Sequence, residues 1–135
     1  ANDRIEAACA TYGQALGTAF QIIDDVLDYD GDAAEMGKNL GDDLREGKCT
    51  LPLIIAMQRA TAEDAQVVRE AIEQGSTEQL PSILSIVKRT GALDATREAA
   101  HNEAMRAIAA LQALPVNAYT QAMEQLAAQL LLRRT

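Results

Sequence analysis

The chain has 135 residues, of which 48% are hydrophobic and only 3% are aromatic, and its formal net charge at pH 7 is −8. This length is enough for one domain with its own core, and the abundance of Ala, Leu, Gln and Glu favours helix. The negative charge argues against nucleic acid or an anionic membrane surface as the main partner, and no window is apolar for long enough to span a membrane.

Hydrophobic spacing and capping residues predict an all-α helical bundle that occupies residues 1–135 as a single unit. The first helix is expected over residues 3–29, and the turn-forming residues 30–32 should end it. Residues 31–48, rich in glycine and in charges of both signs, are expected to form a loop with at most a short turn of helix. The later helices are marked by threonine or asparagine caps, early prolines, or a closing glycine or proline. They are expected over residues 50–59, 61–75, 77–90, 93–114 and 117–135.

The first predicted helix carries Asp24, Asp25 and Asp28 among apolar residues. At about 100° per residue, with Asp24 at zero, Asp28, Gln21 and Asp25 fall at about 40°, about 60° and about 100°, on a single polar arc. Most of the remaining circumference is apolar, which is typical of a buried helix. The apolar stripe consists of Ile5, Cys9, Tyr12, Leu16, Phe20, Ile23 and Leu27. The acids should therefore face a cavity or a partner.

Carboxylates one helical turn apart repel each other, and their burial without a counter-charge would protonate them or destabilise the fold. A divalent cation removes both problems. Mg²⁺ prefers oxygen ligands, takes one or two protein carboxylates and keeps its other positions for water and substrate phosphate. The D-D-x-x-D pattern at residues 24–28 therefore fits a helix that anchors a metal-bridged diphosphate. The alternative is an acidic face in water, or acids paired with basic residues of a neighbouring helix.

Two lysines, Lys38 and Lys48, follow glycines in the loop that is expected after the acids. Their ammonium groups could reach the phosphates that the metal holds, as point charges on flexible stems. Gly37, Gly41 and Gly47 would let the backbone approach closely. The alternative is that both lysines are solvated loop residues.

The stretch from Phe20 to Leu53 reads F-Q-I-I-D-D-V-L-D-Y, then G-K-N-L-G-D-D-L, then E-G-K-C-T-L-P-L. These elements, in this order, resemble the second aspartate-rich region of the trans-polyprenyl diphosphate synthases. The remaining helices are similar in layout to the C-terminal helices of the long-chain bacterial members. The resemblance covers essentially the whole chain, but only the C-terminal part of such an enzyme, and it implies the C-terminal part of the isoprenoid synthase fold.

The resemblance implies a prenyltransferase that elongates an allylic diphosphate with isopentenyl diphosphate to a long-chain, octaprenyl diphosphate for quinone side chains. It implies Mg²⁺ as the cofactor and Asp24, Asp25 and Asp28 as metal ligands. Lys38 and Lys48 would bind the allylic diphosphate, and Gln21 would line the active-site wall. The complete enzyme is expected to be a cytoplasmic homodimer.

The family's first aspartate-rich motif and its isopentenyl diphosphate residues have no match in these 135 residues. We therefore expect the chain to be a piece of a synthase domain and to be catalytically inactive alone. A class I terpene cyclase is an alternative, although the N-S-E-type metal motif of cyclases is absent. A non-catalytic subunit or interaction module is another, although such a subunit has no chemical need for the intact acids and lysines.

Other residues are interpreted as structural. His101 is expected to be a surface or packing residue. Arg133 and Arg134 would favour the dipole at a helix carboxyl end, with a fold back over the diphosphate as the alternative. Cys9 and Cys49 lack metal-ligand or redox spacing and are expected to be reduced and half-buried, which suits a cytosolic protein.

Overall fold

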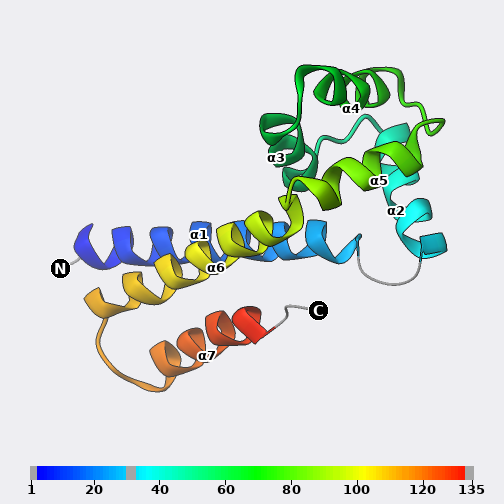
Figure 1. Ribbon diagram of the computed structural model, residues 1–135. Helices are drawn as coiled ribbons and strands as arrows, with labels where there is room; N and C mark the ends of the chain where they lie inside the picture. The colour runs from blue at the N-terminus through cyan, green and yellow to red at the C-terminus, as the bar shows by residue number, and fades with distance from the viewer. Residues whose placement is uncertain (1–2, 30–32, 133–135) are drawn as a thin grey trace. The chain divides into compact units, whose positions relative to one another are not determined.

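The computed structural model describes residues 3–29 and 33–132, and every regular element within them is helical (Figure 1). The helices are α1 (Asp3–Leu27), α2 (Ala33–Arg45), α3 (Leu51–Arg59), α4 (Ala62–Gln74), α5 (Leu80–Arg89), α6 (Ala92–Ala110) and α7 (Ala118–Leu132), with a 3₁₀ turn, η1 (Leu111–Ala113), after α6. The all-α prediction is confirmed. The turn expected at residues 30–32 and the terminal Arg133 and Arg134 lie outside the described residues.

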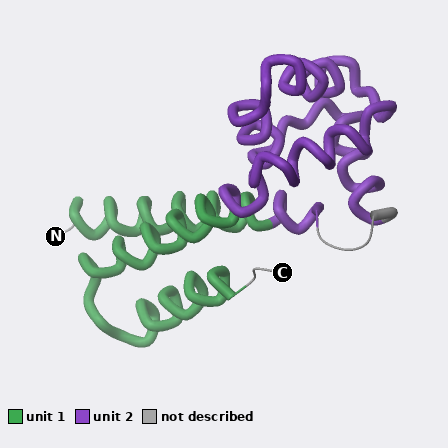
Figure 2. Tube along the Cα trace, viewed as in Figure 1, with its two compact units in different colours: residues 1–23, 97–135 green, residues 24–96 purple. Residues whose placement is uncertain are grey.

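The chain divides into two compact units (Figure 2). Unit 1 comprises residues 1–23 and 97–135, and unit 2 comprises the contiguous residues 24–96. Helices α1 and α6 therefore contribute residues to both units. The expectation that residues 1–135 act as one domain stays a prediction. Within the described part of the chain, no helix combines the length and the apolar content that crossing a membrane requires.

Unit 1 has a core built largely from small side chains. Its buried members are Tyr12, Ala15, Ala107, Leu111 and Ala127. The phenol of Tyr12 donates a hydrogen bond of 2.8 Å to the backbone carbonyl of Met123, so the tyrosine contributes both apolar area and a bond to α7. Alanines at facing positions let helices approach closely, and unit 1 packs in this way.

The predicted apolar stripe of α1 matches its buried face only in part: Tyr12 and Ile23 are buried, and Leu16 and Leu27 are partly buried. Ile5, Cys9 and Phe20 are exposed, Phe20 by 48%. The buried positions of the helix are Ala8, Tyr12, Ala15, Ala19, Ile22, Ile23, Asp25 and Val26. Hydrophobicity alone selected the bulky residues, whereas α1 is buried largely through small and β-branched ones.

Unit 2 has a larger aliphatic core, formed by α2 to α5 with Tyr29 and Ala92. Its buried members are Tyr29, Leu40, Leu44, Leu53, Ala56, Val68, Ala71, Ile83, Ile86, Val87 and Ala92. Helices α3, α4 and α5 pack on one another, and α2 packs against α4 and α5. Unit 2 therefore holds both the end of α1 with its acids and the helices that follow.

The largest correction to the predicted elements is α2, a helix of 13 residues where a loop was expected. Leu40 and Leu44 lie one turn apart and are 1% and 0% exposed. Burial of each leucine stabilises the fold by about 1.5–3 kcal/mol, which offsets the cost of about 1 kcal/mol for each helical glycine. Gly41 lies on the same buried side, with side-chain atoms of Thr77 and Leu80 3.6 Å from where its Cβ would be. These are ordinary van der Waals distances, so the packing would accommodate an alanine at position 41.

The ends of α4 and the start of α7 agree with the predicted caps, whereas the Thr50 side chain makes no capping hydrogen bond and α5 begins at Leu80 instead of residue 77. Thr61 accepts a hydrogen bond of 3.2 Å from the amide of Asp64 at the start of α4, and Gly75 ends that helix with a φ of 62°. Asn117 and Thr120 exchange side chain to backbone hydrogen bonds of 3.0 and 2.9 Å before α7. These bonds satisfy backbone groups that a helix end leaves unpaired.

Candidate diphosphate and metal site

The predicted site residues come from three consecutive segments of unit 2. Asp24 and Asp25 lie in the last turn of α1, and Asp28 immediately follows that helix. Lys38 lies on α2, and Lys48 lies between α2 and α3. Gln21 is placed on α1 one turn before the acids; its side chain is exposed and it falls in unit 1.

Two of the predicted site residues, which carry opposite charges, form an ion pair. The ammonium Nζ of Lys48 lies 3.9 Å from Oδ1 of Asp25. The Asp25 side chain is only 10% exposed, whereas that of Lys48 is 45% exposed. A nearly buried carboxylate needs a counter-charge, and Lys48 supplies one while its ammonium still reaches solvent. The lysine can therefore bind a second anion without leaving Asp25.

A pair of carboxyl groups that the sequence had not indicated brings the residue after α1 close to α2. Asp43 on α2 lies near Asp28, close enough for each carboxyl group to affect the ionisation of the other. Burial and the neighbouring carboxyl of Asp28 raise the pKa of Asp43 to about 6, with a smaller contribution from Asp25, while the charge of Lys48 acts in the opposite direction. Two carboxyl groups this close repel each other when both are ionised, and a cation placed between them would remove that repulsion.

Backbone contacts hold these groups in place. The amide Nδ2 of Asn39 donates to the backbone carbonyl of Asp28 at 3.3 Å. The backbone amide of Lys48 donates to the carbonyl of Asp43 at 2.9 Å, and Gly47 reverses the chain with a φ of 69°. Asp43 therefore lies near Asp28 and bonds the backbone amide of Lys48 through its own carbonyl.

A buried hydroxyl pair accompanies the acids. Tyr29 directly follows Asp28 and is 5% exposed, and Thr50 is 4% exposed two residues after Lys48. Burial raises the pKa of the Tyr29 phenol above its ordinary value, and the charges of Asp43, Asp28 and Asp25 raise it further. The Thr50 hydroxyl opposes this rise, so the two hydroxyls lie near each other. At neutral pH the phenol is a neutral hydrogen-bond donor.

The structure does not bring every predicted residue into this cluster. Within residues 3–29 and 33–132, Lys38 makes no hydrogen bond or ion pair and its side chain is exposed. Asp24 is partly exposed at the end of α1. Asn39 and Asp43 were missed although they are four residues apart, the spacing of one helix face. This spacing indicates a shared helix face only if residues 33–45 are known to form a helix.

The donor set fits a hard cation that keeps most of its ligands for water and substrate. Among the described residues, no three side chains of His, Cys, Asp or Glu converge closely enough to enclose an ion. Mg²⁺ needs no such cage, because one or two carboxylates suffice for it. Asp25, Asp28 and Asp43 present carboxyl oxygens in a partly desolvated place, where their mutual repulsion favours a bound cation. These residues fit Mg²⁺.

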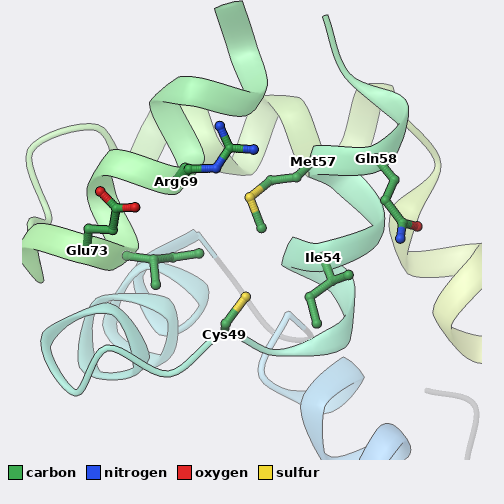
Figure 3. A pocket seen from close by; sticks show the side chains of 7 residues that line it. Cys49, Ile54, Met57, Gln58, Arg69 and Glu73 are labelled. Atoms are coloured by element: carbon green, nitrogen blue, oxygen red, sulfur yellow. The ribbon is translucent and has the colours of Figure 1, made fainter. Parts of the chain in front are cut away.

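A surface pocket of unit 2 lies elsewhere, between α3 and α4 (Figure 3). Its volume is about 510 Å³, and it is lined by Cys49, Ile54, Met57, Gln58, Arg69, Ile72 and Glu73. None of the predicted site residues lines this pocket. Cys49, at its edge, is free and exposed, as is Cys9, so the expectation that both are half-buried is wrong. His101 is partly buried on α6, in line with a packing residue.

Comparison with known proteins identifies the arrangement. Residues 1–87 match the model of the family described as Polyprenyl synthetase. The chain belongs to the polyprenyl synthetase family. Its sequence is 50% identical over 123 residues to the octaprenyl diphosphate synthase of Escherichia coli (strain K12), which covers 90% of this chain and 38% of that protein. The chain thus spans less than half the length of this curated relative, and the family resemblance expected from residues 20–53 is confirmed.

Solved structures of the polyprenyl synthetase family confirm the fold. The polyprenyl synthase from Roseobacter denitrificans superposes with a TM-score of 0.85 at 40% identity, over 98% of this chain and 43% of that one. The polyprenyl synthase from Caulobacter crescentus CB15, complexed with calcium and isoprenyl diphosphate, gives a TM-score of 0.77 at 39% identity. That match covers 100% of this chain and 42% of the other. The chain therefore adopts part of the isoprenoid synthase fold.

Proposed function

We propose that this chain supplies the second aspartate-rich side of a trans-prenyltransferase site. The complete enzyme would elongate an allylic diphosphate with isopentenyl diphosphate to a long-chain, octaprenyl diphosphate used for quinone side chains. The observation that carries this proposal is the ion pair between Lys48 and Asp25 at 3.9 Å, beside the carboxyl pair of Asp28 and Asp43. Metal-binding oxygens and a solvent-accessible ammonium are the two partners that a metal-bound diphosphate needs.

The acids act as the metal-binding side. Asp24, Asp25 and Asp28 would hold Mg²⁺, which when bound neutralises diphosphate charge and makes the diphosphate a better leaving group. Asp25 also holds the ammonium of Lys48 in orientation. Asp43 lies near the Asp28 carboxyl, and Asn39 donates to the Asp28 backbone carbonyl. We expect these interactions to hold the acids in place before a ligand binds.

The lysines act on the leaving group. As the allylic C–O bond breaks, its electron pair stays with the diphosphate oxygen, and negative charge grows there. Lys48 and Lys38 would donate hydrogen bonds to the diphosphate oxygens and stabilise that charge. The double bond of isopentenyl diphosphate then attacks the allylic carbon, and loss of a proton restores a double bond. Gln21 would lie along the wall of the same site.

Binding of inorganic pyrophosphate tests the site in this chain. We expect calorimetric titration in MgCl₂ to show binding that disappears with EDTA. Lys48→Gln should weaken it about tenfold or more, because a charge-assisted hydrogen bond is worth about 1.5–3 kcal/mol. Lys88→Gln is the matched control, since Lys88 is an exposed lysine of α5 and its loss changes net charge equally. Equal effects of the two variants would refute a specific role for Lys48.

Catalysis requires residues outside this chain. We expect the 135-residue chain alone to incorporate no isopentenyl diphosphate. A chimera in which the chain replaces the matching segment of the Escherichia coli octaprenyl diphosphate synthase, its 50% identical relative, should be active with Mg²⁺. Asp28→Asn in that chimera should lower kcat about 10²-fold or more, the usual scale for losing one electrostatic stabiliser. Unchanged activity would make the metal-ligand assignment wrong.

The chimera also separates the alternatives. Pyrophosphate binding without transfer activity in the chimera would favour a non-catalytic subunit, and release of a cyclised hydrocarbon would favour a terpene cyclase. The size of the polyprenyl product tests the octaprenyl proposal. We further propose a homodimeric, cytoplasmic enzyme, which sedimentation of the chimera and localisation of a tagged protein would check. The free cysteines are compatible with a reducing compartment.

A further inference from the structure

Two buried hydroxyls of unit 2 stand without the hydrogen bonds that buried polar groups normally make. The side-chain oxygens of Tyr29 and Thr50 are both inaccessible to solvent, and neither has a hydrogen-bond partner among the described residues. Such orphaned groups are rare in folded proteins because each loses its bonds to water without replacement. A pair of them beside a ligand site calls for a function.

Thr50 occupies the N-cap position of α3, yet its side chain makes no capping hydrogen bond. Pro52 has no amide hydrogen, and the amides of Leu53 and Ile54 bond the backbone carbonyl of Thr50 at 3.1 Å each. The helix start therefore makes no use of the threonine hydroxyl, which remains available to Tyr29.

The two hydroxyls lie close together but short of a hydrogen bond. A weak hydrogen-bonding interaction with Thr50 lowers the pKa of Tyr29, but by distance and angle neither hydroxyl has a hydrogen-bond partner, so the interaction is incomplete. Tyr29 is anchored in the aliphatic core and directly follows Asp28. Thr50 follows Lys48 by two residues. A small movement of the segment 46–50 would thus pair the hydroxyls and would move Lys48 with them.

We propose that Tyr29 and Thr50 are positioning residues whose hydroxyls pair when Lys48 takes up a metal-bound diphosphate. The proposal rests on the proposed function. The diphosphate draws the Lys48 ammonium, the segment 46–50 shifts, and the Thr50 hydroxyl donates to the phenolic oxygen of Tyr29. Because the pairing is favoured only in the loaded state, it strengthens binding by the free energy of that hydrogen bond. Both residues act through Lys48 and touch no substrate.

Variants that remove only the hydroxyls test this pairing in the full chain. The measurement is the Kd for inorganic pyrophosphate at saturating MgCl₂. Tyr29→Phe and Thr50→Val should each raise the Kd about three- to tenfold, the net worth of one hydrogen bond. Thr50→Ser keeps the hydroxyl and should bind like the parent chain. The double variant should bind no worse than either single variant, because one bond is lost in all three.

Two controls separate positioning from a general structural effect. Tyr12→Phe removes a buried tyrosine hydroxyl in unit 1 that bonds the carbonyl of Met123; it should lower the melting temperature and leave the Kd unchanged. Tyr29→Phe should leave the melting temperature of the ligand-free chain unchanged or raise it, because it removes an unpaired group. In a Lys48→Gln background, Tyr29→Phe should have no further effect on binding.

The outcomes distinguish this proposal from the proposed function. Binding by the parent chain with unchanged Kd values for Tyr29→Phe and Thr50→Val would overturn the hydroxyl pairing and leave the site standing. Additive losses in the double variant, or a further loss in the Lys48→Gln background, would also overturn it. No Mg²⁺-dependent binding by the parent chain would overturn the site itself and the pairing with it.

Discussion

Replacement of Asp43 by asparagine should stabilise the metal-free chain, although it removes a residue of the site. In the folded chain the pKa of Asp43 rises from its ordinary 3.8 to about 6, mainly through burial and Asp28. A pKa difference of this size corresponds to a loss of about 3 kcal/mol in folding stability when the carboxyl is ionised, at about 1.4 kcal/mol for each pH unit. Because Asp43 is partly exposed, solvent screening reduces that loss to about 1 kcal/mol.

The pH dependence follows from the direction of this shift. Since folding raises the pKa, the folded chain binds the proton more tightly than the unfolded chain does. The carboxyl therefore destabilises the fold progressively as the pH rises from about 4 to about 6, and fully above that range. Asp43→Asn should gain about 1 kcal/mol, or about 4 °C in Tm, at neutral pH, and most of that gain should vanish near pH 4.

Thermal unfolding in EDTA at both pH values measures this effect. The matched control is Asp42→Asn on the adjacent position, because Asp42 pairs with Arg45 at 2.9 Å and does not share the contact with Asp28. That variant should show no gain at either pH. MgCl₂ should then stabilise the parent chain more than Asp43→Asn. If Asp43→Asn is no more stable than the parent at neutral pH, the carboxyl repulsion described here is wrong.

Two further predictions concern the fold. Leu40→Ala should destabilise unit 2 by about 2–5 kcal/mol in denaturant unfolding, because Leu40 is 1% exposed in the core. The control, Leu132→Ala, replaces a leucine that is 82% exposed and should have almost no effect. Similar losses of stability in the two variants would contradict the packing of α2. Gly75→Ala should lower the free energy of unfolding by about 1 kcal/mol or more, because Gly75 has a φ of 62° and an added Cβ would lie 3.4 Å from the carbonyl oxygen of Leu44. An unchanged free energy of unfolding in the same assay would contradict this backbone strain.

The parts of the fold that sequence reasoning predicted are those with local chemical signals. Thr61 and Gly75 bound α4 because capping and left-handed backbone are properties of single residues. Helix α2 was missed because its glycines argue against helix locally, and only tertiary burial of Leu40 and Leu44 outweighs them. The buried face of α1 was predicted only in part for a similar reason, since close packing through Ala15 depends on the facing helices.

The candidate site shows the same division. The D-D-x-x-D spacing and the two lysines could be read from the chain, because they depend on residue type and order. The approach of Lys48 to Asp25 and that of Asp43 to Asp28 depend on how α2 returns toward α1. The unpaired hydroxyls of Tyr29 and Thr50 could not be predicted, because the absence of a hydrogen bond leaves no pattern in the sequence.

The division of the chain into a contiguous and a discontinuous unit bears on the order in which it is built. Unit 2 consists of residues 24–96 alone, whereas unit 1 needs both ends of the chain, as the bond from Tyr12 to Met123 shows. Contacts between distant residues form late because a long loop must close first. During synthesis, the acids, Lys48 and their supporting core can therefore assemble while α7 is still in the ribosome. The acids and lysines of the candidate site all lie in this contiguous unit.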